Sequence, residues 1–222
     1  MTTEPSNFLI TGSDTGAPDP EATLLLAHGA GAAMDSAFMN QMADLLADRR
    51  IRVIRFEFPY MVSRRLTGKR KPAPKAELLM DAYKTTVTEA FRDLPGRVAI
   101  GGKSMGGRVA SLVADQLHGA GAVQGLVCLG YPFHPPGTPD KLRTAHLASL
   151  KCPALIVQGE RDPFGTRDEV EGYVLSKSIG VTWMTDGDHD FGPRGASGVT
   201  RKANLTAAAD AVAAFLRALP AR

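Results

Sequence analysis

The sequence predicts an α/β fold: a doubly wound, mostly parallel sheet of about six to seven strands with helices on both faces. Short apolar runs alternate with longer segments of helical period, which is the pattern of parallel strands joined by crossover helices. The apolar runs have little polar interruption, as expected for strands covered on both faces. The length of 222 residues suits one such domain, spanning residues 1–222.

The predicted strands are short apolar segments separated by helical or irregular stretches. An edge strand is expected at the start of the chain, before the first clearly buried one. In chain order the strands are Asn7–Thr11, Thr23–Ala27, Ile51–Phe58, Arg97–Gly101, Val123–Gly130, Ala154–Gln158 and Val181–Thr185.

The predicted helices are identified by apolar residues three or four positions apart. The first begins at Asp35, a suitable N-cap, and places Phe38, Met42, Leu45 and Leu46 on one face. The others are Glu77–Phe91, a helix starting at Met105, Arg167–Ser176, and a last helix carrying Leu205, Ala208, Val212, Phe215 and Leu219.

Two segments show no such period and are expected to be irregular. Pro59–Lys75 is rich in basic residues, and Tyr131–Leu147 contains four prolines. The basic segment is interpreted either as a solvated loop or as an attractor for an anionic acyl substrate or an acidic partner. Its basic residues are Arg64, Arg65, Lys69, Arg70, Lys71 and Lys75.

The composition excludes several classes of protein. Apolar residues make up 44% of the chain, which argues against disorder, and a net charge of +3 does not require nucleic acid or a membrane as partner. The segment Met1–Pro5 lacks a signal-peptide pattern, and no apolar run approaches the roughly 20 residues that span a bilayer. We therefore expect a cytoplasmic protein that binds neither nucleic acid nor membrane.

The two cysteines, Cys128 and Cys152, stand in or beside apolar runs. Two cysteines do not make a disulfide framework, so they are interpreted as buried thiols in a reducing compartment. A zinc site would need ligands clustered at short spacing, and the sequence has no such cluster. We expect no metal and no organic cofactor.

The strongest motif is Gly-Lys-Ser-Met-Gly at Gly102–Gly106, which matches G-x-S-x-G. It follows a predicted strand and precedes a predicted helix, the context in which such a serine is lifted above the sheet on a sharp turn. The helix N-terminus then favours developing negative charge at the reaction centre. Ser104 is therefore the candidate nucleophile. The alternatives are a packing turn or a phosphate cradle, although no nucleotide-binding glycine pattern accompanies it.

A base and an acid are expected in later loops that follow strands. His189 lies in an acidic loop between the last strand and the last helix, so it is the candidate base. The acid should lie between serine and histidine in chain order, and Asp162 follows the strand ending at Gln158. Asp162 would hold the imidazole in its reactive tautomer, with Glu160 as the alternative acid.

The loop after the first buried strand reads His-Gly-Ala-Gly from His28. Acyl transfer needs backbone N–H donors aimed at the developing oxyanion. Met105, which follows the nucleophile, is expected to supply one donor, and Ala30 or Gly29 the other. His28 is interpreted as a structural residue that ties this loop down.

These motifs together resemble those of the α/β-hydrolases over nearly the whole chain. The resemblance is carried by His28–Gly31, Gly102–Gly107, Gln158–Asp162 and Gly187–His189. It implies the α/β-hydrolase fold and a Ser104–Asp162–His189 triad.

The segments Phe56–Tyr60 and Gly130–Gly137 resemble, more narrowly, small bacterial hydrolases grouped with the dienelactone hydrolases. That group borders a testis-expressed animal protein and a subunit of an animal chromatin-modifying complex. Dienelactone hydrolases proper use a cysteine nucleophile, so Ser104 departs from them.

The pocket is expected to be open and shallow, because Tyr131–Leu147 is too short to form a separate cap domain. Tyr131, Phe133 and His134 are candidate walls, with loop packing as the alternative. Glu57 ends a strand near the site, so it is expected either to line the pocket or to cap a turn.

The sequence thus predicts a serine hydrolase that acts on a small carboxylic ester or thioester through an acyl-enzyme. Its partner would be a small-molecule substrate, whose leaving group is selected by the pocket and not by the triad. The oligomeric state is not set by these patterns. The alternative is a non-catalytic scaffold with the same fold, in which the three triad residues would have no purpose.

Overall fold

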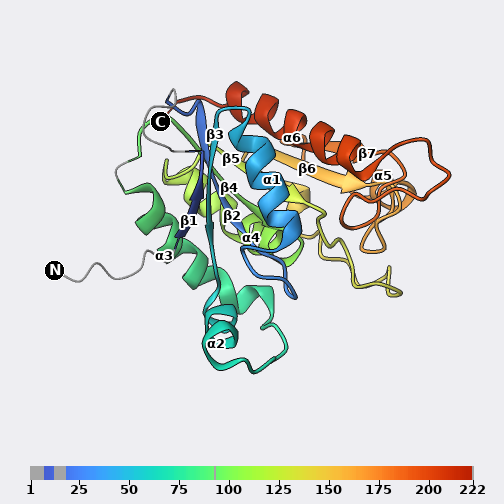
Figure 1. Ribbon diagram of the computed structural model, residues 1–222, viewed down its shortest axis with the longest axis horizontal. Coiled ribbons are helices and arrows are strands. Elements are labelled where there is room, and N and C mark those ends of the chain that lie inside the picture. Colours follow the sequence, from blue (N-terminus) through green and yellow to red (C-terminus); the bar gives the residue numbers. More distant parts are fainter. Residues whose placement is uncertain (1–7, 13–18, 93, 222) are drawn as a thin grey trace.

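The computed structural model describes residues 8–12, 19–92 and 94–221 and contains one seven-stranded sheet (Figure 1). Its strand order is β1-β3-β2-β4-β5-β6-β7, with β1 antiparallel to β3 and every other pair parallel. The predicted fold class is confirmed. The strands are β1 (Phe8–Thr11), β2 (Ala22–Ala27), β3 (Ile51–Phe56), β4 (Arg97–Lys103), β5 (Gly125–Leu129), β6 (Ala154–Gly159) and β7 (Ile179–Met184).

The predicted strands are present with ends shifted by a few residues. The expected edge strand is observed as β1, while its first predicted residue, Asn7, and the segment Met1–Pro5 lie outside the described residues. Strands β2, β5 and β6 are buried at every position, which explains their uninterrupted apolar sequences.

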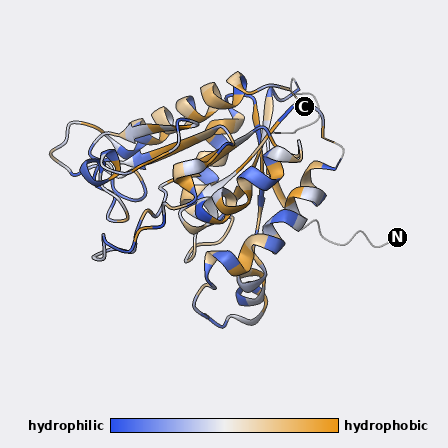
Figure 2. Ribbon diagram, turned by 180° about the vertical axis from the view of Figure 1, so that it is seen from behind, coloured by the Kyte–Doolittle hydropathy of each residue, from blue (hydrophilic) through white to orange (hydrophobic). Residues whose placement is uncertain are grey.

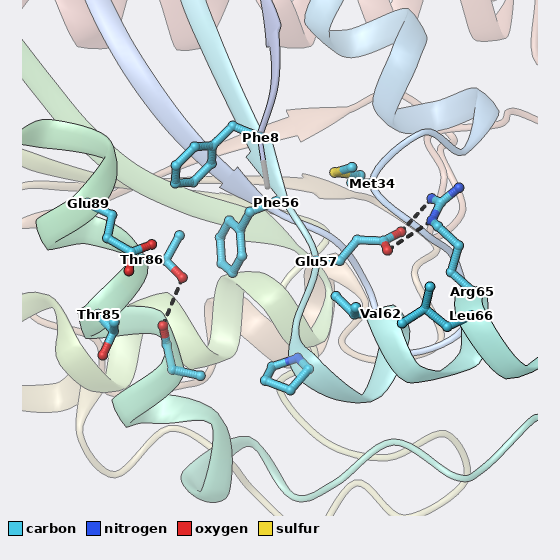
Figure 3. Close-up of a pocket in the computed structure, with 12 residues that line it drawn as sticks. Phe8, Met34, Phe56, Glu57, Val62, Arg65, Leu66, Thr85, Thr86 and Glu89 are labelled. Atoms are coloured by element: carbon cyan, nitrogen blue, oxygen red, sulfur yellow. Dashed lines mark hydrogen bonds and ion pairs between the residues drawn. The ribbon is translucent and has the colours of Figure 1, made fainter. Parts of the chain in front are cut away.

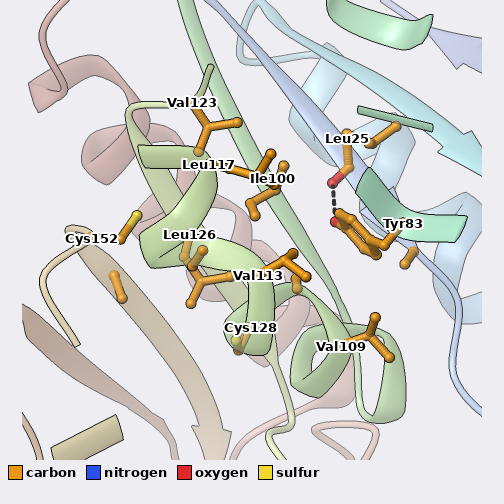
Figure 4. Packing of buried hydrophobic residues seen from close by; sticks show 14 of the residues in the cluster. Leu25, Tyr83, Ile100, Val109, Val113, Leu117, Val123, Leu126, Cys128 and Cys152 are labelled. Atoms are coloured by element: carbon orange, nitrogen blue, oxygen red, sulfur yellow. Dashed lines mark hydrogen bonds between the residues drawn. The ribbon is translucent and has the colours of Figure 1, made fainter. Parts of the chain in front are cut away.

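Two hydrophobic cores cover the two faces of the sheet. Helices α1 (Ala37–Ala47) and α6 (Arg201–Ala218) pack on one face, and α3 (Met80–Phe91) and α4 (Met105–Gly119) pack on the other. Figure 2 shows the hydrophobic colour along the strands and α6, with hydrophilic loops around them. Figure 4 shows part of the core on the α3–α4 face, in which Val109 and Val113 of α4 belong to the same cluster as Leu126 and Cys128 of β5.

Several predicted helix ends differ from the observed ones. Ser36, not Asp35, is the N-cap of α1, and the Asp35 carboxylate pairs with the Arg65 guanidinium at 2.9 Å. The predicted helix Arg167–Ser176 is confined to α5 (Arg167–Glu171), which ends at Gly172. The predicted helix Glu77–Phe91 begins as a 3₁₀ turn, η1 (Ala76–Leu79), which leads into α3.

The largest correction concerns the basic segment Pro59–Lys75, whose first half is not irregular but forms α2 (Pro59–Thr67). Pro59 occupies the first turn, where its missing N–H costs nothing, and Gly68 ends the helix in the left-handed conformation. Only Met61 of this helix is buried, so no apolar period marks it in the sequence. Figure 1 shows α2 projecting from the body of the fold.

The chain between β5 and β6 contains no α-helix, only turns and the short 3₁₀ helix η2 (Leu147–Ser149). This agrees with the predicted minimal cap. The carboxyl ends of β2 and β4 are neighbours, because the chain continues from β2 to β3 on one side and returns to β4 on the other. Loops that follow these two strands therefore meet at the switch point of the sheet.

Candidate active site

Ser104 occupies the sharp turn between β4 and α4. Its φ of 52° and ψ of −118° are seldom adopted by residues other than glycine, at a cost of about 1–3 kcal/mol. The flanking glycines make the turn possible. A Cβ on Gly102 would lie 2.3 Å from the Gly106 carbonyl carbon, and one on Gly106 would lie 2.5 Å from the His28 carbonyl oxygen. The turn therefore presents the serine at the N-terminus of a 15-residue helix.

His189 and Asp162 are brought together from the loops after β7 and β6. The Nδ1 atom of His189 lies 2.8 Å from Oδ2 of Asp162, whose side chain is fully buried. The same carboxylate accepts hydrogen bonds from Gln158 Nε2 at 3.0 Å and from the Phe164 backbone N–H at 2.9 Å. With Nδ1 donating to the carboxylate, Nε2 of His189 is left as the proton acceptor.

Ser104 and His189 line one cavity of about 500 Å³. Its other walls are the loop after β2, the start of α1, and the side chains of Lys103, Phe164 and Arg201. The Phe164 ring packs against the His189 imidazole, with 4.4 Å between ring centroids. The predicted nucleophile and base thus share a solvent-accessible space with mixed apolar and polar walls.

The loop after β2 lies beside Ser104, because β2 and β4 end next to each other in the sheet. A Cβ on Gly29 would lie 3.7 Å from the Ser104 Cβ, and both Gly29 and Ala30 line the cavity. Met105 is the first residue of α4, so its N–H has no carbonyl partner within the helix. The residues predicted to supply the oxyanion donors therefore adjoin Ser104: Met105 follows it in the chain, and Gly29 lies beside it.

The buried side chain of His28 supports the loop after β2. It is fully buried, its Nδ1 lies 2.7 Å from the Gly29 carbonyl oxygen, and its Nε2 accepts the Phe58 backbone N–H at 3.1 Å. Burial lowers the pKa of His28, so the imidazole is neutral, and a proton on Nδ1 satisfies both contacts. Because N–H and C=O of a trans peptide point in opposite directions, this contact turns the Ala30 N–H away from His28.

Helix α2 holds the same loop from the side. Tyr60 Oη donates to the Ala30 carbonyl oxygen at 3.1 Å, and Arg64 Nη1 donates to the Gly31 carbonyl oxygen at 3.2 Å. Partial burial raises the pKa of Tyr60 to about 12, so the hydroxyl remains a donor. Helix α2, the first half of the basic segment, thus contacts the loop after β2, which the sequence did not indicate.

The predicted wall residues Tyr131, Phe133 and His134 lie away from this cavity. All three are buried, and the Tyr131 and Phe133 rings pack against each other with 4.9 Å between centroids. His134 Nδ1 lies 2.9 Å from the Pro135 carbonyl oxygen, and its Nε2 lies 3.4 Å from Glu169. The structure therefore places these aromatic side chains in the packing of the loop after β5.

Glu57 lies at a second cavity, of about 670 Å³, between α2, α3 and the β1–β3 edge (Figure 3). Its carboxylate is 4% exposed and lies 2.6 Å from Arg65 Nη2, and the same guanidinium bridges to Asp35. Neither Ser104 nor His189 lines this cavity. Glu57 therefore fixes α2 against the loop that contains Asp35.

Three contacts in the site were not anticipated from the sequence. Gln158 was expected only as the end of a strand, yet its amide also holds both backbone polar groups of Tyr131. The Phe164 ring packs against the His189 imidazole, and the Lys103 ammonium group donates to the His189 carbonyl oxygen. Gln158 interrupts the apolar run of β6, and this was the one feature of the sequence that could have indicated its role. The alternative acid, Glu160, pairs with Arg167 at 3.0 Å instead of His189.

Within the described residues, no group of three or more histidine, cysteine, aspartate or glutamate side chains is placed to hold a metal ion. No helix among those residues is long and apolar enough to cross a membrane.

Comparison with known proteins places this geometry in a family. The model of the "Alpha/beta hydrolase domain" family matches residues 20–217. An α/β serine hydrolase homologue from Coxiella burnetii has a similar structure, with a TM-score of 0.66 and 18% identity over 94% of this chain and 90% of that one. A serine hydrolase without lid from Xanthomonas campestris also gives a TM-score of 0.66 and 18% identity, over 96% and 90%.

A dienelactone hydrolase from Anabaena variabilis gives a TM-score of 0.66 and 21% identity, over 90% of this chain and 88% of that one. At these identities the neighbours show the fold. Together with the family model they agree with the predicted resemblance. The chain belongs to the α/β-hydrolase domain family.

Proposed function

We propose that this chain is a single-domain serine hydrolase that cleaves small carboxylic esters or thioesters through an acyl-enzyme. Ser104 is the nucleophile, His189 the general base and Asp162 the residue that orients the base. The N–H groups of Met105 and Ala30, with Gly29 beside them, hold the oxyanion. The cytoplasm is its proposed location, with which the free, buried Cys128 and Cys152 agree.

One observation carries the proposal. A strained serine at a helix N-terminus shares a cavity with a histidine whose Nδ1 lies 2.8 Å from a fully buried carboxylate. Folding spends free energy both on the φ of Ser104 and on the burial of Asp162. A fold that served only as a scaffold would need neither feature at the same cavity.

The mechanism follows from these positions. Ser104 Oγ attacks the acyl carbon while His189 Nε2 accepts its proton, and the new oxyanion receives N–H bonds from Met105 and Ala30. Asp162 stabilises the imidazolium without itself taking the proton. The oxyanion then collapses, the bond from the acyl carbon to the leaving oxygen or sulfur breaks, and the imidazolium protonates the departing atom, which leaves as an alcohol or thiol. A water molecule, deprotonated by the same imidazole, releases the acid and restores Ser104.

The cavity supports a small acyl group. Its volume of about 500 Å³ lies within the range of small-molecule sites, and Phe38 and Met39 give it an apolar wall. The loop after β5 adds no helical cover. An ester or thioester leaving group would therefore extend toward solvent, which is why both remain in the proposed substrate class.

The test is labelling with a fluorophosphonate, read by intact mass. We expect one adduct on the wild-type protein and none on Ser104→Ala. His189→Ala should label at least 10²-fold more slowly, because general-base assistance typically contributes 10²–10⁴-fold.

A matched control comes from a second serine–histidine pair. Ser111 Oγ lies 2.8 Å from His146 Nε2, and neither residue lines the cavity. Ser111→Ala should therefore label like the wild type. A folded wild-type protein without an adduct would contradict the proposal and favour the scaffold alternative.

A further inference from the structure

Lys103, the residue before the nucleophile, has a nearly buried ammonium group. Its side chain is only 8% exposed, and burial lowers the pKa of this lysine, an effect that Asp190 opposes. Burying a lysine without partners is costly, so the contacts of its ammonium group indicate its role. The mechanism proposed above does not use this charge.

The contacts of Lys103 converge on the loop that carries the base. Its Nζ donates to the His189 carbonyl oxygen at 2.8 Å and lies 3.1 Å from Oδ1 of Asp190. It also lies 5.1 Å from the centroid of the Phe38 ring, within the range of a cation–π contact. One side chain therefore links the turn of the nucleophile to the backbone of the base.

Gly130 closes the space around this link. Its φ is +64°, and a Cβ there would lie 3.0 Å from the His189 carbonyl oxygen and 3.1 Å from Lys103 Nζ. A side chain here would crowd both groups and would be strained at this φ, so glycine suits the close approach of the end of β5. The ammonium and the carbonyl are thus packed against backbone.

We propose that Lys103 is a positioning residue that sets the distance between Ser104 and His189 by donating to the His189 carbonyl. This rests on the proposed serine-hydrolase function. Asp162 fixes the rotation of the imidazole, whereas Lys103 fixes the loop from which the imidazole extends. Asp190, whose carboxylate is 59% exposed, balances the charge and contributes little to the tie itself.

The test compares Lys103→Met with the double variant Lys103→Met/Asp190→Asn. Methionine keeps the apolar stem and removes the donor. We expect both variants to label about 10- to 100-fold more slowly than wild type, because a buried bond from a charged donor is lost in each. With an ester substrate the loss should fall on kcat, with KM nearly unchanged.

A second readout does not need activity: the NMR chemical shifts of the His189 ring at one fixed pH, assigned with His189→Ala. Release of the base loop in Lys103→Met should move these shifts, because the bond from Nζ to the His189 carbonyl oxygen is lost. The double variant should keep the displaced shifts while labelling stays slow.

The control is Lys84→Met, which removes the lysine of an exposed pair with Asp81 on α3 and should change neither readout. If Lys103→Met does not fold, Asp190→Asn keeps the donor and should label within about threefold of wild type. Wild-type labelling and ring chemical shifts in Lys103→Met, recovery of labelling in the double variant, or a large loss in Asp190→Asn would each overturn the proposal. Failure of the hydrolase function would appear differently, as wild-type protein without an adduct whose ring chemical shifts still respond to Lys103→Met.

Discussion

The two sides of Ser104 are held in different ways. The loop with the candidate base is held by buried groups: Asp162 and Gln158 are fully buried, and Lys103 is nearly so. The loop with the candidate oxyanion donors has one buried support, His28, and is held otherwise by α2, through Tyr60 and Arg64 near solvent. Electrostatic interactions strengthen as solvent is excluded, so the base side should tolerate less change than the oxyanion side.

The largest effect should come from Asp162→Asn on the base side. The amide retains the shape but favours the wrong imidazole tautomer, so we expect kcat to fall about 10⁴-fold. Ester hydrolysis under saturating substrate would measure it. Glu160→Gln is the matched control, since Glu160 pairs with Arg167, and it should retain activity. Equal losses of kcat in both variants would contradict the assignment of Asp162 as the acid that orients His189.

A smaller effect is expected when α2 releases the oxyanion loop. Tyr60→Phe removes a hydroxyl that contacts the Gly29 and Ala30 carbonyls, and Arg64→Met removes one donor to Gly31, so each should lower kcat about five- to tenfold. Affinity for a boronic acid, which resembles the tetrahedral intermediate, should fall in parallel while KM stays nearly constant. A fall in kcat as large as that of Asp162→Asn would mean that the oxyanion side tolerates change no better than the base side.

A second buried group on the oxyanion side is Glu57, whose side chain is 4% exposed. Arg65→Met leaves this carboxylate unpaired, so the free energy of unfolding should fall by about 1–3 kcal/mol in urea titration. Replacing Glu57 by glutamine in the same variant should recover part of that loss. The exposed pair of Lys84 with Asp81 sets the comparison, and its removal should cost under about 1 kcal/mol.

The smallest effect should be a pH dependence of stability from His28, the buried support of the oxyanion loop. Burial lowers its pKa in the folded protein, so below pH 6.5 the unfolded chain binds a proton that the folded chain does not. Stability should therefore decline as the pH falls from 6.5 toward the folded-state pKa. Urea unfolding at several pH values should show a shallower decline for His28→Gln; an unchanged slope would assign the effect to another group, such as His146.

The sequence predicted the parts of the molecule that depend on local pattern. Buried parallel strands leave apolar runs, and the serine turn requires glycines two positions before and after it, so both could be identified. Asp162 and His189 were selected by their order after strands, and the structure places them in hydrogen-bonding contact.

The parts that were not predicted depend on long-range contacts. Helix α2 buries only Met61 and so has no apolar period. Lys103 was expected simply as a residue of the turn, because the loop that covers it lies far along the chain. For Tyr131 and Phe133 the sequence left a pocket wall and loop packing as alternatives, and their full burial supports packing, which a loop sequence does not indicate.

The most direct test of the central claim is to trap the acyl-enzyme. Wild-type protein would be mixed with p-nitrophenyl acetate, quenched in acid within the first turnover, and digested for peptide mass analysis. We predict an acetyl group on Ser104 that disappears as substrate is exhausted and that is absent from Ser104→Ala. Release of p-nitrophenol by the wild type with no acetyl group on Ser104 would contradict the account.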